Sequence, residues 1–551
     1  MVPELITGNR ISGSYFYDLL DHKYNIKYNI KMNKTNNITI VGGGSAGWMT
    51  AATLIHQFPN KTITVIESPN IPTVGVGEST IRGIRNWTNL LGIKDEEFIK
   101  FTDASYKLSI RFTDFYKKDS GSFHYPFAQP YVQENMANKN DWYFKKVLHP
   151  NTPVSDYADC LYPNMALVNQ NKITTKPILP GFELTRDSAY HFDATKFGLW
   201  LRDNYAMPRG VRHVQAEVKD IVLNDDGIES LVLDNGTSVT ADLFIDCTGF
   251  KSMLLGGALK EPFNSYEDML PNNSAWATRV VYRDKRRQLE PWTDCTAIGN
   301  GWVWNIPLWS RIGTGYVYSD KFVSDADALE EFKEHLKSKG NKNVDELEFK
   351  NIKMRVGIHR RLWVKNVCAI GLSAGFIEPL ESSGLFTVHE FLLLLVRSLQ
   401  RDCVNQWDKD VFSAACVRQF REFSEFVAMH YALSHRDDTP YWRAVSNKEY
   451  SADMIDQKAP FHLGFTFFGL NKMRDFEFDN GGLHCIATGM NWFPTDLLSM
   501  QLGSNSFDVN QMRRSLDPHI RQMDQRKEFW KQSVQGEPDL YDYLKNTFYK
   551  E

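Results

Sequence analysis

Three glycines at fixed spacing carry the clearest chemical signal in the chain. Gly42, Gly44 and Gly47 form a G-x-G-x-x-G pattern between a β-branched run, Ile38–Val41, and a helical pattern, Ser45–Phe58. The first glycine permits a tight turn, the second lets the backbone approach a pyrophosphate, and the third allows the helix to pack closely on the strand. Because a helix N-terminus offers N–H groups to an anion, the pattern predicts a dinucleotide site.

Two further segments extend this site. Thr62–Ile66 is a second β-branched strand, and Glu67 at its end is placed to hold ribose hydroxyls. Far downstream, the apolar segment Ala241–Gly249 ends in Asp246-Cys-Thr-Gly and resembles the second nucleotide-contacting strand of flavin monooxygenases of the hydroxylase superfamily. A buried strand that merely ends at a glycine turn is the alternative for this segment alone. Together the two segments favour FAD over NAD.

A tryptophan-rich strand narrows the chemistry. Gly301–Pro307 reads Gly-Trp-Val-Trp-Asn-Ile-Pro, and the alternation of a strand puts Trp302 and Trp304 on one face. By themselves these residues suggest an aromatic pair in a core. The W-x-W-x-I-P spacing resembles the hallmark of flavin-dependent halogenases of the tryptophan-halogenase type. In that family the tryptophans lie near the flavin and are thought to keep the organic substrate away from it.

Other segments resemble the same family in the same order. Ile71–Thr80 is similar to its GVGEAT loop, with Ser79 where the family has alanine, and Ala104–Leu108 is similar to the segment that carries its essential lysine, here Lys107. Three more segments match: His191–Ala194, Phe376–Gly384 and Arg436–Trp442. The resemblance runs from about residue 38 to about residue 500, and the shared order is more specific than any single motif.

The resemblance implies a mechanism. Reduced FAD and O2 oxidise a halide to hypohalous acid, which travels through the protein to the substrate. Lys107 then meets it, by hydrogen bonding or as a haloamine, and Glu381 stabilises the cationic ring intermediate and takes its proton. Without the resemblance, Lys107 would be interpreted as a surface lysine on a strand. For Glu381, a structural ion pair with an arginine would be as good an interpretation as a catalytic role.

The resemblance and the glycine pattern together assign site residues to each ligand. The residues expected to bind the cofactor are Gly42, Gly44, Ser45, Ala46, Gly47, Glu67, Gly75, Val76, Gly77, Glu78, Ser79, Asp246, Gly249, Trp302, Trp304, Ile306, Pro307 and Gly371. Backbone N–H groups of Ser383 and Gly384, at a helix start, are expected to hold the halide, and Ser383 stands where the family usually has threonine. The substrate residues are Tyr125, Phe127 and Glu381.

The substrate-recognition segment departs from the family pattern. Leu483 and His484 stand where tryptophan-specific members have a tyrosine pair before the cysteine, here Cys485. We therefore expect a looser pocket that takes varied indoles or phenols rather than free tryptophan. Chloride, bromide and iodide all remain open as halides. Since no reductase domain is visible, a separate flavin reductase is expected to supply reduced FAD.

The periodicity of the chain predicts an α/β fold. We expect a Rossmann-like FAD-binding domain of the flavin monooxygenase type over residues 38–385, with an appended, mostly helical substrate-binding subdomain over 386–551 that covers the substrate site. Residues 1–37 are expected to be an extension that is non-native or disordered, with translation starting at Met32. Residues from about 120 to 180 lack periodicity and are expected to be loops around the substrate.

Three more regions have a predicted secondary structure. Val214–Ile245 is expected to be rich in strands, and 264–350 to alternate short strands with loops. Within the latter, Asp325–Ser338 is expected to be a helix. From Gly384 to about Ser434, apolar residues recur at helical spacing.

Composition excludes several classes of function. A net charge of −4 gives no reason to expect nucleic-acid binding, and the longest apolar run, Phe391–Val396, is too short to span a membrane. Seven scattered cysteines without a C-x-x-C pair favour a reducing, cytoplasmic location and argue against structural zinc. His389-Glu390 begins like a zinc-protease helix, but Leu393 stands where the second histidine would be, so no metal is expected. A homo-oligomer is compatible with the sequence.

Two alternative functions stay open at this point. An FAD-dependent aromatic hydroxylase would use the same cofactor but transfer oxygen; the bulky tryptophan pair, Lys107 and Glu381 count against it. A non-catalytic flavin-binding protein would bind FAD without forming a halide-dependent product. The mass of the product distinguishes halogen transfer from both.

Overall fold

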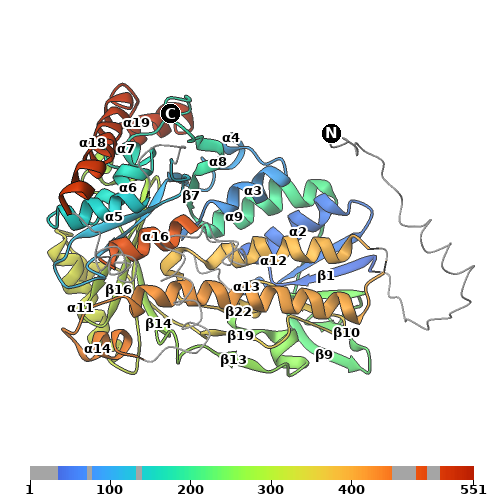
Figure 1. The fold of residues 1–551 in the computed structure, drawn as a ribbon. Coiled ribbons are helices and arrows are strands. Elements are labelled where there is room, and N and C mark those ends of the chain that lie inside the picture. Colours follow the sequence, from blue (N-terminus) through green and yellow to red (C-terminus); the bar gives the residue numbers. More distant parts are fainter. Residues whose placement is uncertain are drawn as a thin grey trace, which may run out of the picture.

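The computed structural model describes six stretches of the chain: residues 35–70, 77–131, 139–401, 403–448, 480–492 and 509–550. Their strands form β-sheets, and helices pack around these sheets in an α/β fold (Figure 1). Within these stretches, no helix is long and apolar enough to cross a membrane.

The first sheet is mainly parallel and is built around the glycine motif. Its order is β20-β21-β12-β1-β2-β8, and every neighbouring pair except β20–β21 is parallel. Its strands are β1 (Asn37–Val41), β2 (Thr62–Glu67), β8 (Arg212–Gln215), β12 (Leu243–Asp246), β20 (Trp363–Val364) and β21 (Val367–Ala369). Ile40 pairs with Val65 on one side and Ile245 on the other, so β1 is central and buried. Helix α2 (Ser45–Gln57) joins β1 to β2, which confirms the predicted strand–helix–strand unit.

The second sheet has seven strands and carries the tryptophan motif near its middle. Its order is β18-β14-β17-β16-β15-β5-β6, with β15 and β5 parallel and the other pairs antiparallel. The strands are β5 (Ser109–Thr113), β6 (Ser122–Pro126), β14 (Ser274–Val280), β15 (Trp292–Ile298), β16 (Gly301–Pro307), β17 (Ile312–Tyr318) and β18 (Lys350–Lys353).

A small three-stranded sheet brings distant motifs together. Its order is β3 (Glu78–Ser79), β7 (Ala189–Phe192) and β4 (Ser105–Lys107). In the register of this sheet His191 lies between Ser79 on one side and Ser105 on the other. Three segments that resemble the halogenase family therefore meet at one place.

Two other small sheets flank these. One is the hairpin set β9 (Val218–Asn224), β10 (Gly227–Leu233) and β11 (Ser238–Val239), in the region predicted to be rich in strands. The other consists of β13 (Phe263–Ser265), β19 (Gly357–His359) and β22 (Gly375–Phe376).

The described residues from 384 to 434 are mostly helical, as the apolar spacing of this segment predicts. α12 (Gly384–Leu399) and α13 (Gln406–Ala432) run side by side, and α12 also packs on α2 (Figure 1). α12 begins at Gly384, so the expected boundary at residue 385 falls within its first turn. The C-terminal helices α18 (Val509–Ser533) and α19 (Leu540–Thr547) lie at the end of the molecule away from β9 and β10 (Figure 1). The predicted helix Asp325–Ser338 is α11, with the same bounds.

The remaining helices are short connections or covers. They are α3 (Gly83–Leu90), α4 (Asp95–Phe98), α8 (Leu184–Asp187), α9 (Ala194–Trp200), α10 (Lys285–Gln288), α14 (Pro440–Ser446) and α16 (Asn480–Gly489). Single turns η3 (Gly249–Lys251), η6 (Gly371–Ser373) and η7 (Pro379–Glu381) carry predicted site residues.

The prediction of loops from about residue 120 to 180 is wrong in part. This stretch contains β6 and three helices, α5 (Lys139–Leu148), α6 (Asp156–Leu161) and α7 (Met165–Val168). The helices are too short to show a helical period and are held by tertiary contacts with α18. Lys145 pairs with Asp156 at 2.8 Å and with Asp524 of α18 at 2.6 Å, beside the buried Trp142.

Candidate active site

The three motif glycines have different surroundings. Gly42 has φ +113°, and a Cβ there would lie 2.2 Å from the carbonyl oxygen of Cys247. A Cβ on Gly47 would lie 1.9 Å from the carbonyl oxygen of Gly42, whereas one on Gly44 would meet no atom within 4 Å. No side chain caps the first turn of α2. The first and third glycines are thus required by packing, and the second leaves open space at a helix N-terminus.

Other residues expected at the cofactor gather around this turn. Glu67 lies against Gly43, and its Oε2 is 2.8 Å from Nε2 of His213. Gly371 has φ +77°, and a Cβ there would come within 2.8 Å of the Cβ of Ala46 in the first turn of α2. The expected residues Gly75 and Val76 lie outside the described stretches.

Asp246 is hydrogen-bonded to the backbone of the segment that follows it. Its buried carboxylate accepts hydrogen bonds from the backbone N–H groups of Thr248 at 3.0 Å, Leu254 at 2.8 Å and Leu255 at 2.9 Å. The side chain therefore holds the segment that begins with Gly249, which itself has φ +69° and open space on its Cβ side. Asp246 shapes the edge of the open space, with its carboxylate turned toward backbone.

The tryptophan strand packs into the core. Trp302 is fully buried and its Nε1 donates a hydrogen bond to Oε2 of Glu378 at 2.9 Å. The Trp304 ring lies against Gly315, where a Cβ would come within 2.1 Å of the ring. The two indole centroids are 6.2 Å apart. A Cβ on Gly77 would lie 3.8 Å from Cγ2 of Ile306.

Lys107 ends β4 in a fully buried position. Its Nζ donates hydrogen bonds to Oγ of Ser79 at 2.7 Å, to the carbonyl oxygen of Thr80 at 3.0 Å and to Oγ of Ser382 at 2.8 Å. The same Nζ lies 5.0 Å from the ring centroid of Phe127. Since an ammonium has three hydrogens, this cradle of three acceptors fits the protonated form.

The surroundings of Lys107 also favour loss of its proton. Burial lowers the pKa of Lys107 to about 7, against the opposing fields of Cys295 and Glu381. At neutral pH both the ammonium and the amine are therefore populated. The side chain can either donate hydrogen bonds or act as a nucleophile.

Glu381 lies beside Lys107, at the end of η7 and directly before Ser382. It is 1% exposed, and its Oε1 is 2.9 Å from Nε2 of His430 on α13. The Nδ1 of His430 is 3.1 Å from the carbonyl oxygen of Val427. Burial raises the pKa of Glu381, whereas His430 and Lys107 oppose that rise. The structure thus brings the predicted lysine and carboxylate together.

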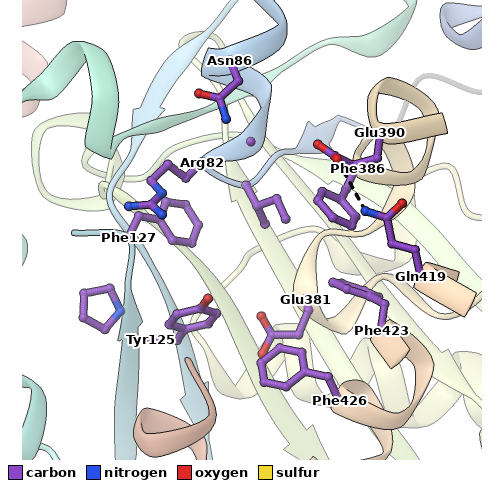
Figure 2. Close-up of a pocket in the computed structure, with 13 residues that line it drawn as sticks. Arg82, Asn86, Tyr125, Phe127, Glu381, Phe386, Glu390, Gln419, Phe423 and Phe426 are labelled. Carbon is purple, nitrogen blue, oxygen red and sulfur yellow. Dashed lines mark hydrogen bonds between the residues drawn. The ribbon is translucent and has the colours of Figure 1, made fainter. Parts of the chain in front are cut away.

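A cavity of about 320 Å³ opens onto Glu381 (Figure 2). This volume is at the lower end of the range of about 300–1,000 Å³ for small-molecule pockets. The predicted substrate residues Tyr125, Phe127 and Glu381 all line it, and aromatic side chains of α12 and α13 face them. The aromatic lining residues are Tyr125, Phe127, Phe386, Phe423 and Phe426, and the polar ones besides Glu381 are Arg82, Asn86, Glu390 and Gln419. Such a lining suits an aromatic ring with a polar substituent.

The predicted halide residues lie at the N-terminus of α12. Ser383 precedes the helix, Gly384 begins it, and no side chain caps its first turn. A Cβ on Gly384 would lie 3.2 Å from Oε2 of Glu78. Burial raises the pKa of Glu78 to about 7. An anion here would meet both an uncapped helix end and a carboxyl group that is partly protonated at neutral pH.

Sequence reasoning missed some residues of the site. His430 contacts Glu381, and Glu378 accepts from Trp302, but neither was singled out. His430 falls on the buried stripe of α13 one turn after Phe426, and a histidine on such a stripe was the available signal. Ser79 was assigned to the cofactor, whereas its hydroxyl accepts from Lys107.

The chain is similar to known proteins over most of its length. The family model described as tryptophan halogenase matches residues 37–499. The chain is 33% identical over 494 residues to the tryptophan 6-halogenase ThaL of Streptomyces albogriseolus, covering 85% of this chain and 91% of that protein. Among solved structures, the VirX1 apo structure has a TM-score of 0.84 at 36% identity, covering 94% of this chain and 100% of that one. BrvH, a flavin-dependent halogenase from Brevundimonas sp. BAL3, has a TM-score of 0.78 at 28% identity, covering 93% and 100%.

Proposed function

This chain belongs to the tryptophan halogenase family and is a flavin-dependent halogenase, and on that premise we propose that it transfers an oxidised halogen through Lys107 and Glu381 to an electron-rich aromatic such as an indole. The observation that carries the proposal is the meeting of a fully buried lysine and a fully buried carboxylate beside an aromatic cavity. Buried groups of opposite charge with pKa values shifted toward neutrality suit acid–base chemistry.

FAD is the cofactor of this proposal, in its reduced form. The open space beside Gly44 and the uncapped turn of α2 fit a pyrophosphate, with Ser45, Ala46 and Gly47 as its backbone donors and Glu67 as the ribose partner. When bound, reduced FAD would supply two of the four electrons that O2 takes up. The halide would supply the other two and so become hypohalous acid. The chain's own part is to bind, to exclude water and to direct the halogen.

Substitutions at two of the glycines separate cofactor binding from folding. Gly44→Ala is expected to weaken FAD binding at least about tenfold with little change in thermal stability, because its Cβ enters open space. Gly47→Ala is expected to lower the melting temperature, because its Cβ would lie 1.9 Å from a carbonyl oxygen. Flavin fluorescence titration and thermal unfolding measure the two effects. Equal loss of stability in both variants would contradict the assignment.

Lys107 and Glu381 have complementary tasks in the proposal. The Nζ of Lys107 receives the hypohalous acid, either by donating a hydrogen bond to it or, as the amine, by taking the halogen. The carboxylate of Glu381 stabilises the positive charge that develops on the ring and accepts the ring proton. Glu381 lines the cavity, whereas Lys107 does not line it and lies with its Nζ 5.0 Å from the ring centroid of Phe127, which does.

Halide binding at Ser383 and Gly384 is expected to depend on the charge of Glu78. Because the pKa of Glu78 is raised to about 7, the carboxyl is neutral below that pH and repels an anion above it. The apparent KM for halide is therefore expected to rise above pH 7, by up to about tenfold per pH unit. Steady-state kinetics at saturating FAD would measure this rise, and Glu78→Gln is expected to flatten it. A wild-type KM that stays constant from pH 6 to pH 9 would refute the coupling.

The cavity supports a substrate class broader than free tryptophan. Its aromatic lining suits indoles or phenols. Leu483 and His484 on α16 are buried, do not line the cavity, and stand where tryptophan-specific members have a tyrosine pair. A reaction of the protein with FAD, a reductase with NADH, O2 and each halide in turn, on a panel of indoles, tests this by the mass of the product. Halogenated indoles are expected. Oxygen transfer, or tryptophan far outcompeting indole, would overturn the proposal.

Residues 38–385 act as a Rossmann-like FAD-binding module and 386–551 as the helical subdomain that covers the substrate. The enzyme is cytoplasmic, works with a separate flavin reductase, and is compatible with a homo-oligomer.

A further inference from the structure

A line of buried polar side chains leads away from Lys107. The first link is the hydrogen bond from Lys107 Nζ to Ser79 Oγ, 2.7 Å. Ser79 Oγ is 2.6 Å from Thr293 Oγ1, which in turn is 2.9 Å from Nε2 of His191. All four side chains are at most 5% exposed. His191 belongs to a family-like segment to which the halogenase proposal gives no task.

The direction of each hydrogen bond follows by elimination. Ser105 donates its one hydroxyl hydrogen to the carbonyl oxygen of Pro307 at 2.6 Å, so its oxygen accepts from Nδ1 of His191 at 3.3 Å. A neutral histidine has one N–H, so Nε2 must accept from Thr293. The oxygen of Thr293 then accepts from Ser79, and the oxygen of Ser79 accepts from the lysine.

The neutral state of His191 is supported by its surroundings. Burial and the nearby Lys107 both hold the pKa of His191 well below its usual range. The other titratable groups that act on Lys107 are Cys295 from β15 and Glu381 from η7. The described residues thus place one proton acceptor, Nε2 of His191, at the end of the line.

We propose that Ser79, Thr293 and His191 form a proton-transfer chain that moves a proton between Lys107 and His191 inside the protein. In one direction an N–H bond of Lys107 breaks, the proton joins Ser79, the hydroxyl hydrogen of Ser79 passes to Thr293, and that of Thr293 passes to Nε2 of His191. The ammonium becomes an amine and the imidazole becomes an imidazolium. The reverse movement restores both, so no other reactant is needed.

The proton-transfer chain lets the buried Lys107 gain or lose a proton without contact with bulk water. The inference rests on the proposed role of Lys107, which needs an ammonium to hydrogen-bond an oxidant or an amine to take the halogen. Ser79 is essential to it, and it stands where the family's GVGEAT loop has alanine, which has no hydroxyl to pass a proton. Ser79, Thr293 and His191 act as positioning residues, since they reach the reacting atoms only through Lys107.

A matched pair of variants at Thr293 tests the chain in the full-length protein supplied with FAD, reductase, NADH, O2 and bromide. Thr293→Val keeps the shape and removes the hydroxyl, and it is expected to lower the rate of indole halogenation about tenfold. The loss should vary with pH and come with a changed solvent deuterium isotope effect, while NADH consumption continues. Thr293→Ser is expected to restore the wild-type rate and pH profile.

The outcomes separate this inference from the proposed function. A wild-type halogenation rate and pH profile in Thr293→Val would contradict the proton-transfer chain. An equal, pH-independent loss of the halogenation rate in Thr293→Val and Thr293→Ser would contradict it as well. If Lys107→Ala still halogenated indole, the proposed function itself would fail. If Thr293→Val does not fold, Ser79→Ala takes its place, because it removes the hydroxyl that forms the first link. A wild-type pH profile in Ser79→Ala would contradict the proton-transfer chain.

Discussion

Replacing Lys107 with alanine is expected to abolish halogenated product while reduced flavin continues to be oxidised. The expected loss of the halogenation rate is at least about 10³-fold, because the variant loses the only fully buried ammonium that the described residues place beside Glu381. NADH consumption and halogenated indole, measured in the same samples, give the two rates. Oxidation of the flavin should proceed because the glycine turn and α2 are unaltered.

A second variant controls for the possibility that Lys107→Ala is inactive because it does not fold. Lys107→Met keeps a long side chain in the buried space but has no N–H to donate to Ser79, Thr80 or Ser382. It should retain FAD binding and be as inactive in halogenation as the alanine variant. Halogenation at the wild-type rate in either variant would show that the role given to Lys107 is wrong.

Replacing Glu381 with glutamine is expected to lower halogenation about 10²-fold. The amide keeps the size of the side chain but has neither the negative charge that stabilises the ring cation nor a basic oxygen to take its proton. Because burial raises the pKa of Glu381, the wild-type rate should fall as the pH drops through that pKa and the carboxylate becomes protonated. The glutamine variant should lack this acidic decline, which a pH–rate profile measures.

Glu261→Gln is the matched control for this variant. Glu261 is also a buried carboxylate, but it pairs with Arg361 at 2.7 Å and does not line the cavity. Its replacement should lower thermal stability and leave the pH dependence of halogenation as in the wild type. A similar loss of halogenation in both variants would mean that any buried carboxylate matters equally, against the role proposed for Glu381.

The sequence was most informative where a local pattern determines the structure. The spacing of Gly42, Gly44 and Gly47 predicts the turn, because each glycine answers a separate steric demand that the structure displays. The bounds of α11 follow from Ser324, which caps the helix through the backbone N–H of Asp327. Patterns of this kind depend on neighbours in the chain, and they are visible in one sequence.

The parts that escaped prediction depend on contacts between distant segments. Whether His430 meets Glu381 depends on how α13 lies against η7, which no local pattern records. The carboxylate of Asp246 could be expected near a nucleotide, but whether it faces a ligand or the N–H groups of Leu254 and Leu255 depends on the turn that follows. The short helices α5 and α6 pack against α18 and their aromatic residues Trp142, Tyr143 and Tyr157 are buried, in a segment without helical periodicity.

The hydroxyl of Ser79 illustrates the same limit within the site itself. A resemblance to a loop assigns the residue to the cofactor, yet the register of β3 against β7 turns its side chain toward Lys107 and His191. The departure from the family's alanine was visible in the sequence. Its consequence required the positions of Thr293 and Ser105, which come from other strands.

The central claim is that the halogen reaches the substrate inside the cavity, directed by Lys107 and Glu381. The distribution of ring isomers in the halogenated product, determined by NMR for the enzyme and for the same indole treated with free hypohalous acid, tests it most directly. One dominant isomer is expected from the enzyme and a different mixture from the free reagent. The same mixture from both would mean that the halogen reacts in solution and would contradict the account.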